Sequence, residues 1–404
     1  MSVASTLVVL YCVSTAVAIA VRGLRVPYTV ALVLVGLALG AFHLVAPPNL
    51  TQELLFTFFL PGLLFEAAFH LHLDAFQRVW KSAVGLAVPG VLIGMTLTAL
   101  LVIAAGRLFG FAQGLDLRLA LVFGALVAAT DPVAVTALFK ELHAPRRLAA
   151  LVETESLFND GTGVVFLAII LSYAMGVTSS VLDVSLQFAV LVGGGVVVGL
   201  LVGWIISMII HRVNEPVIEI GLTVIAAYGS FVLADRLGAS GVLATVAAGM
   251  MCGRHGRDLG MHEASRAAAR SFWEYIAFAL NSIVFLLIGF QFDAQRMQSI
   301  WMELIIAFAA MLVARAVIVY GMILLTRGTG EQVPIAWGSV ITVGGLRGAL
   351  SMVLALALPA DLPQRELLVS MTVGVVLLSI IVQGLSMPVL IRRLRLADDP
   401  PLKS

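Results

Sequence analysis

Long apolar stretches follow one another through almost the whole chain, and no other feature constrains the fold as strongly. A helix that crosses a bilayer needs about 20 mostly apolar residues. Only 12% of the 404 residues are Asp, Glu, Lys or Arg, against about 25% in soluble domains. We therefore predict an all-α polytopic membrane protein with about thirteen transmembrane helices. The predicted spans are approximately 3–21, 26–45, 52–70, 82–105, 118–139, 147–175, 184–211, 215–235, 240–253, 271–291, 300–326, 334–358 and 366–391.

Charge and cysteine content exclude several classes of protein. The formal net charge is only +1, so we expect no nucleic-acid partner. Cys12 and Cys252 lie in separate apolar segments without the spacing of metal ligands, which excludes a disulfide scaffold and a zinc site. The sequence shows neither a Ser–His pair nor a pair of catalytic aspartates, so it does not indicate an intramembrane hydrolase. We predict neither an enzyme nor a bound cofactor.

The basic residues indicate the orientation, because cytoplasmic loops are enriched in Lys and Arg. If the C-terminus lies inside, seventeen of the 24 basic residues fall on the cytoplasmic side, five outside and two within spans. We therefore predict that the N-terminus lies outside and that a short tail, 392–404, is cytoplasmic. The whole chain, 1–404, is then one membrane domain, and its longest polar connection, 254–270, is expected to be a loop or short surface helix.

Two predicted spans, the fifth (118–139) and the twelfth (334–358), are interrupted near their middle. The interruptions are Thr130-Asp131-Pro132 and Gly344-Gly345. The two spans lie seven apart, an odd number, so the halves that contain them have opposite orientations in the membrane. Paired interrupted helices in inverted halves are typical of the midplane binding site of a secondary transporter.

Seven ionisable side chains fall within predicted spans, where each costs about 2.5–3.5 kcal/mol on insertion scales. They are Glu66, Asp131, Glu153, Glu155, Asp160, Arg315 and Arg347. Most of them gather on or near the spans that contain helix breakers, which favours one polar site over a set of isolated structural pairs.

The sixth predicted span combines four acidic and amide side chains with a serine. On a helix, Glu153, Ser156 and Asp160 share one face, while Glu155 and Asn159 share a neighbouring face. One stripe can present oxygens to a cation. The stripe with Glu155 and Asn159 can pair with a basic side chain, for which Arg347 is the candidate. No role is assigned to Glu153.

The break in the fifth span accounts for the charged residue Asp131 within it. Pro132 removes a backbone donor and disfavours helix at Asp131, so we expect the helix to open there. Asp131 can then cap the half-helix that follows, and we interpret it as mainly architectural. At the other break, Gly344-Gly345, the freed carbonyl groups can be compensated by Arg347. Asp160 is then the carboxylate left to bind an ion.

Five short segments carry most of these residues. They are Phe65-Glu66-Ala67, Ala129-Thr130-Asp131-Pro132, Glu155-Ser156-Leu157-Phe158-Asn159-Asp160, Ala314-Arg315-Ala316 and Gly344-Gly345-Leu346-Arg347-Gly348-Ala349. Together they resemble the signatures of monovalent cation/proton antiporters of the NhaP/NHE (Na⁺/H⁺ exchanger) branch. The resemblance extends over essentially the whole membrane domain, in family order.

The resemblance implies two inverted six-helix repeats, with the fifth and twelfth spans crossing at their unwound centres. A core part, approximately 82–175 and 300–391, would transport the ion. A dimerisation part, approximately 3–70 and 184–291, would hold a second copy in a homodimer.

The resemblance also implies roles for single residues. Asp160 would bind the cation and the proton, and Thr130, Ser156 and Glu66 would supply further ligands, so that these four would hold Na⁺. Residues that would stabilise the site are Asp131, Asn159, Glu155, Arg347 and Arg315.

The implied function is exchange of Na⁺ or Li⁺ for H⁺ by alternating access, with both ions competing for Asp160. Asn159 precedes this residue as in electroneutral members of the family, so we expect a 1:1 electroneutral exchange. The partners are the alkali cation, the proton and membrane lipids. The short tail leads us to expect a prokaryotic inner membrane. The alternatives are a K⁺/H⁺ antiporter, a sodium-coupled symporter or, in a different class, an ion channel or cation sensor.

Overall fold

Helices form all of the regular structure in the part of the chain that our computed structural model describes. Within this described part, seven helices are long and apolar enough to cross a membrane, or eight if one bent pair is a single span, and there are five shorter apolar helices. Every predicted span contains helix, so the all-α membrane class is confirmed. The described residues are 3–21, 27–42, 55–71, 76–110, 115–176, 181–213, 215–255, 263–290, 292–327, 333–394 and 396.

Contacts divide the chain into two compact units. The first unit comprises 1–49, 74–159 and 282–404, and the second comprises 50–73 and 160–281. Helices α10 (Arg146–Ala174) and α14 (Glu263–Phe290) each contribute residues to both units. The predicted core and dimerisation parts were defined by transport and by dimer formation. The division into two units does not test them, so they stay predictions.

In the first unit, α8 (Leu117–Leu126) and α9 (Val133–Glu141) are the two halves of one predicted broken span. The residues between them, 127–132, are not helical, and we call them the first break. Because Pro132 lacks a backbone N–H and disfavours helix at the preceding residue, the chain leaves the helix where the sequence predicts.

The other predicted broken span consists of α17 (Ile335–Gly344) and α18 (Ala349–Leu356), which are bent by 42° relative to each other. We call the residues between them, 345–348, the second break. The backbone N–H of Asp131 donates to the carbonyl of Leu346 at 2.7 Å. The two breaks therefore meet.

Two long helices of the first unit contain a π-helical turn. Trp80–Phe109 consists of α6 (Trp80–Gly85), η2 (Leu86–Gly90) and α7 (Val91–Phe109). Arg365–Arg393 consists of α19 (Arg365–Leu378), η4 (Ser379–Gln383) and α20 (Gly384–Arg393). Such turns occur frequently at functional sites.

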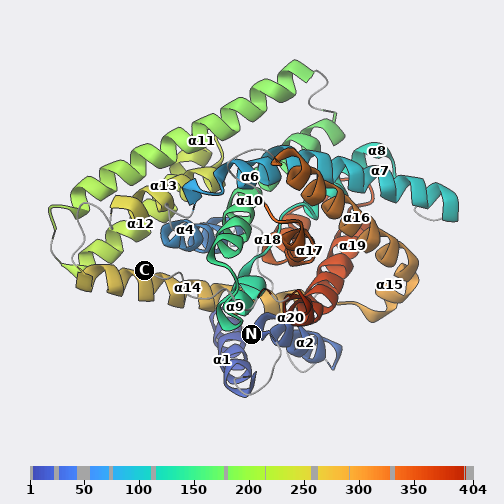
Figure 1. Ribbon diagram of the computed structural model, residues 1–404, viewed down its shortest axis with the longest axis horizontal. Coiled ribbons are helices and arrows are strands. Elements are labelled where there is room, and N and C mark those ends of the chain that lie inside the picture. Colours follow the sequence, from blue (N-terminus) through green and yellow to red (C-terminus); the bar gives the residue numbers. More distant parts are fainter. Residues whose placement is uncertain are drawn as a thin grey trace. The chain divides into compact units, whose positions relative to one another are not determined.

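Helix α16 (Trp301–Leu325) packs against α7, α17 and α19 (Figure 1). A buried hydrophobic cluster, which includes Leu151, Val319 and Ile341, fills the space among α9, α10, α16 and α17. The broken helices are thus held in an apolar surround. The remaining helices of the first unit are α1 (Val3–Val21), α2 (Tyr28–Ala41), α15 (Ala294–Ser299) and α16 (Trp301–Leu325).

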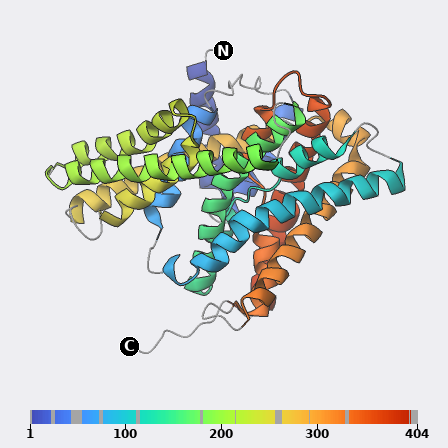
Figure 2. The ribbon, with the colours of Figure 1, turned by 90° about the horizontal axis from the view of Figure 1, so that it is seen from above.

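The second unit packs its helices through glycines. Helices α11, α12 and α13 lie side by side in both views (Figures 1 and 2). A Cβ at Gly199 would meet the backbone of Ala244, and one at Gly253 would meet the backbone of Phe69. Helix α13 is therefore in close contact with α11 on one side and α4 on the other. The helices are η1 (Leu55–Phe59), α4 (Leu60–His70), α11 (Val181–Ile210), α12 (Pro216–Arg236), α13 (Gly241–His255) and parts of α10 and α14.

The prediction of a loop or short surface helix at 254–270 is wrong for its second half. Residues 263–270 are the first turns of α14, and Ser265 and Ala269 are buried there. The arginines in this stretch suggested a polar connection, but alanine and arginine are also strong helix formers. Residues 256–262 lie outside the described part of the chain.

Candidate functional site

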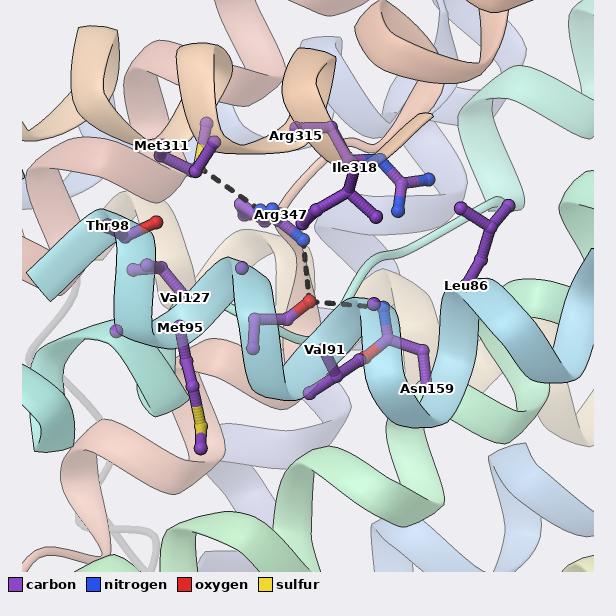
Figure 3. Close-up of a pocket in the computed structure, with 15 residues that line it drawn as sticks. Leu86, Val91, Met95, Thr98, Val127, Asn159, Met311, Arg315, Ile318 and Arg347 are labelled. Carbon is purple, nitrogen blue, oxygen red and sulfur yellow. Dashed lines mark hydrogen bonds between the residues drawn. The ribbon is translucent and has the colours of Figure 1, made fainter. Parts of the chain in front are cut away.

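Arg347 reaches from the second break to the first. Its Nη1 donates to the carbonyl of Ala128 at 2.7 Å and to that of Ala129 at 3.2 Å. Its Nε lies 3.1 Å from Sδ of Met311, and Figure 3 shows the dashed line between these two side chains. Arg347 therefore compensates carbonyl groups of the first break, and not those of its own broken helix as the sequence suggested.

Helix α10 supplies the other donors for the first break. The Asn159 side chain donates to the carbonyl of Ala128 at 3.1 Å and to the Thr130 hydroxyl at 3.3 Å. The Ser156 hydroxyl donates to the carbonyl of Thr130. All of these side chains are buried. Three successive carbonyl groups that a continuous helix would have used are therefore paired with side chains, as buried backbone groups require.

Glu155 anchors this network through a buried ion pair with Arg315 of α16. The two side chains form a bidentate pair, with N···O distances of 2.9 and 2.8 Å. Oε1 of Glu155 also accepts from Asn159 at 3.1 Å. The prediction that Arg347 would pair with Glu155 is wrong, because the planar fork of Arg315 already occupies both carboxylate oxygens.

Asp131 caps the N-termini of α9 and α18, the helices that follow the first and the second break. Its carboxylate accepts the backbone N–H of Val133, the first residue of α9, at 3.0 Å. The backbone N–H of Ala349, the first residue of α18, bonds to the same carboxylate. Gly348 lies so close that a Cβ there would meet the Asp131 side chain. A carboxylate at two helix N-termini is favourable because unpaired N–H groups and the helix dipole both attract it.

Asp160 and Glu66 belong to the second unit. Asp160 follows Asn159 directly on α10 and is half-buried, as is Glu153 on the same helix. Glu66 lies on α4, where Oε1 of its carboxylate is 3.2 Å from Nδ1 of His70. His70 also approaches Glu274 of α14, at 3.7 Å.

A cavity of about 320 Å³, which includes open space at its mouth, lies beside the first break. Figure 3 shows Asn159, Arg315 and Arg347 among its lining residues. The other walls are helices α7, α8 and α16 and η2. Two acidic and two basic side chains, Asp131, Glu155, Arg315 and Arg347, lie around the breaks, so their formal charges sum to zero. Hydroxyl, carbonyl and carboxylate oxygens are the ligands that a hard cation prefers.

Sequence reasoning missed Ser379 and Gln383 of η4. The Ser379 hydroxyl accepts the backbone N–H of Arg347 at 2.9 Å, and the Gln383 side chain donates to the carbonyl of Val343 at 3.0 Å. Both side chains are buried. Their one signal in the sequence is a pair of polar residues four apart within the apolar stretch 373–385.

Comparisons with known proteins agree with these features. A family model described as "Sodium/hydrogen exchanger, transmembrane" matches residues 8–393. The low-affinity Na⁺/H⁺ antiporter NhaS1 of Synechocystis sp. is 38% identical over 383 residues, which cover 93% of this chain and 71% of that protein. The Na⁺/H⁺ antiporter NhaP of Pseudomonas aeruginosa is 39% identical, over 87% of this chain and 84% of that protein. The sodium proton antiporter MjNhaP1 from Methanocaldococcus jannaschii has the same fold, with a TM-score of 0.80, 22% identity and coverage of 98% and 99%.

Proposed function

Because the chain belongs to the sodium/hydrogen exchanger family, we propose that it exchanges Na⁺ or Li⁺ for protons across a prokaryotic inner membrane by alternating access. The observation that supports this best is the meeting of two broken helices beside α10, where the charges around the breaks balance among themselves. A relative from Synechocystis sp. is named as a Na⁺/H⁺ antiporter, which favours exchange over the channel, sensor and enzyme alternatives.

The proposed chemistry is competition for the carboxylate of Asp160. This group can bind a proton or a dehydrated alkali cation, but not both. Ser156 lies one turn earlier on the same helix face and is bonded to Thr130, so hard oxygen ligands are available for the cation. The balanced charges around the breaks need not change when either ion binds. We include Glu66 as a further ligand on its motif alone, because its described partner is His70.

An empty site would have to cross the membrane with an exposed charge, and that is costly. We propose that the core moves only when Asp160 is neutralised by a cation or a proton, so that one cation is exchanged for one proton. Asn159 contributes no charge to this step, since it is a neutral amide bonded to the first break. Exchange is then electroneutral.

We also propose an architecture for the functional protein. The five shorter apolar helices and the bent pair would cross the membrane with the seven long ones, giving thirteen spans in two inverted repeats. The distribution of Lys and Arg supports an N-terminus outside and a cytoplasmic C-terminus. Two copies would assemble as a homodimer.

The test is sodium-dependent proton flux in proteoliposomes. We expect the wild type to alkalinise or acidify the lumen according to the sodium gradient, and Asp160→Asn to abolish this flux. Asp183→Asn is the matched control, because Asp183 is exposed in the first turn of α11. Flux retained in Asp160→Asn would place the binding carboxylate elsewhere.

The same vesicles test stoichiometry and selectivity. An electroneutral exchanger keeps its rate when a membrane potential is imposed, and a potential-dependent rate, with proton leaks excluded, would contradict 1:1 exchange. Replacing Na⁺ with Li⁺ and K⁺ in turn separates the proposal from a K⁺/H⁺ antiporter. A sodium-coupled symporter would show no proton flux driven by the sodium gradient.

A further inference from the structure

The second break interrupts several helical hydrogen bonds, and one of them is the bond between Arg347 and Val343. In a continuous α-helix the N–H of Arg347 would donate to the carbonyl of Val343, four residues earlier. In the structure the N–H of Arg347 donates to Oγ of Ser379 at 2.9 Å, while the carbonyl of Val343 accepts from Nε2 of Gln383 at 3.0 Å. These two backbone groups are therefore bonded to the same neighbouring element.

Ser379 and Gln383 are themselves joined, because the hydroxyl of Ser379 donates to Oε1 of Gln383. The two residues are the first and last of the π turn η4, and their relative exposures are 0% and 2%. The result is a directional chain of three hydrogen bonds, from the Arg347 N–H through both side chains to the Val343 carbonyl. It replaces the direct bond between the N–H of Arg347 and the carbonyl of Val343.

We propose that Ser379 and Gln383 are positioning residues of the exchange site. They join the N–H of Arg347 to the carbonyl of Val343, which the second break has separated. The chain fixes the backbone of Arg347, whose guanidinium bonds the carbonyls of the first break. It also fixes Leu346, whose carbonyl accepts the N–H of Asp131. This role rests on the proposed function, since positioning matters only if the breaks form the site.

The chemistry of the chain explains why these two residue types suit it. A hydroxyl can accept one hydrogen bond while it donates another, and a primary amide has both an acceptor oxygen and a donor nitrogen. Loss of either side chain leaves a buried backbone group unpaired, and the surrounding membrane offers no replacement. Because the chain links both ends of the break, loss of one member is expected to disable the whole chain.

The test compares side chains of equal shape at position 379. Ser379→Thr keeps the hydroxyl and Ser379→Val removes it, so the difference between them isolates the hydrogen bonds. Gln383→Leu is examined alone and together with Ser379→Val. The control is Thr372→Val, because Thr372 is equally buried on α19 but bonds only to the carbonyl of Leu368 in its own helix.

Maximal exchange rate and half-saturating sodium concentration are measured in proteoliposomes at several pH values. We expect Ser379→Val to exchange about tenfold more slowly than Ser379→Thr, because both hydrogen bonds of the hydroxyl are lost together. The half-saturating sodium concentration is expected to change little, because no ion ligand is removed. The double variant is expected to be no slower than either single variant, and Thr372→Val to equal the wild type.

The outcomes separate the two proposals. An inactive wild type contradicts the proposed function. An active wild type with equal rates for Ser379→Thr and Ser379→Val contradicts the positioning role, and so does a double variant whose loss is the product of the single losses. If Ser379→Val does not fold, Ser379→Ala replaces it in the same comparison.

Discussion

The two breaks meet each other, yet they are stabilised by different chemistry. The first break is held by Arg347, Asn159 and Ser156, and through Asn159 by the buried pair of Glu155 and Arg315. At the second break, the N–H of Arg347 and the carbonyl of Val343 are bonded to a neutral hydroxyl and a neutral amide of η4, and the N–H of Ala349 is bonded to the carboxylate of Asp131. The first break thus depends mainly on buried charged and amide donors, and the second on neutral side chains together with one shared carboxylate.

The difference follows from which backbone groups each break leaves unpaired. At the first break three successive carbonyls, those of residues 128–130, need donors from outside the helix. Guanidinium and amide groups supply several donors from one side chain. At the second break the N–H of Arg347 and the carbonyl of Val343 are separated from each other, and a chain with one donor end and one acceptor end joins them. Side chains with several donors thus pair a run of carbonyls, whereas this one separated pair is joined without a charged group.

The largest expected effect is the loss of one partner from the charged network. Glu155→Gln or Arg315→Gln leaves an uncompensated charge in an apolar surround and is expected to destabilise the protein by about 3–5 kcal/mol. The double variant removes both charges and is expected to melt at a higher temperature than either single variant. Thermal melting of the purified protein in detergent measures this. A double variant no more stable than the single variants would mean that charge pairing does not hold the first break.

A smaller effect is expected where the two breaks touch. Gly348→Ala places a Cβ against the side chain of Asp131, and such overpacking typically costs about 1–3 kcal/mol. The control is Gly321→Ala in the middle of α16, where nothing lies within 4 Å of the new Cβ. That change is expected to stabilise by about 0.5–1 kcal/mol, because alanine is the better helix former. Equal melting temperatures for the two variants would contradict the close approach of the breaks.

Much of the first break was predictable from the sequence, because its residues are anomalous in a membrane. Pro132 marks the position of the break, and an aspartate before a proline predicts a cap. Ionised side chains at membrane depth require a reason, so Glu155, Arg315 and Arg347 stand out as members of one site. The position of the second break was equally visible from its paired glycines.

The partners within the site were not predictable. Both Arg315 and Arg347 lie on neighbouring spans, and attraction between opposite charges does not say which arginine reaches Glu155. The choice depends on side-chain geometry that only the packed helices define. Ser379 and Gln383 were not predictable for another reason. Neutral polar residues are common in membrane helices, where they bond to backbone groups of their own helix or of a neighbouring helix. Nothing in their spacing says that they serve a different helix.

The smallest expected effect distinguishes a hydroxyl that holds a break from one that is merely buried near it. Ser351 lies on α18 with 0% exposure, and among the described residues its Oγ has no hydrogen-bond partner. Because no protein bond is lost, Ser351→Ala is expected to change the free energy of unfolding by less than about 0.5 kcal/mol, whereas Ser379→Ala leaves the N–H of Arg347 unpaired and is expected to cost more. Melting temperatures of the two variants, measured side by side, check this. An equal loss in both would mean that burial of a hydroxyl, and not its place in the hydrogen-bond chain, decides stability here. A stable Ser351→Ala with slowed sodium exchange would instead show that this hydroxyl contacts the ion or its water during transport. Helix α18, which follows the second break, would then take a direct part in binding, as we propose for Thr130 of the first break and Ser156 of α10.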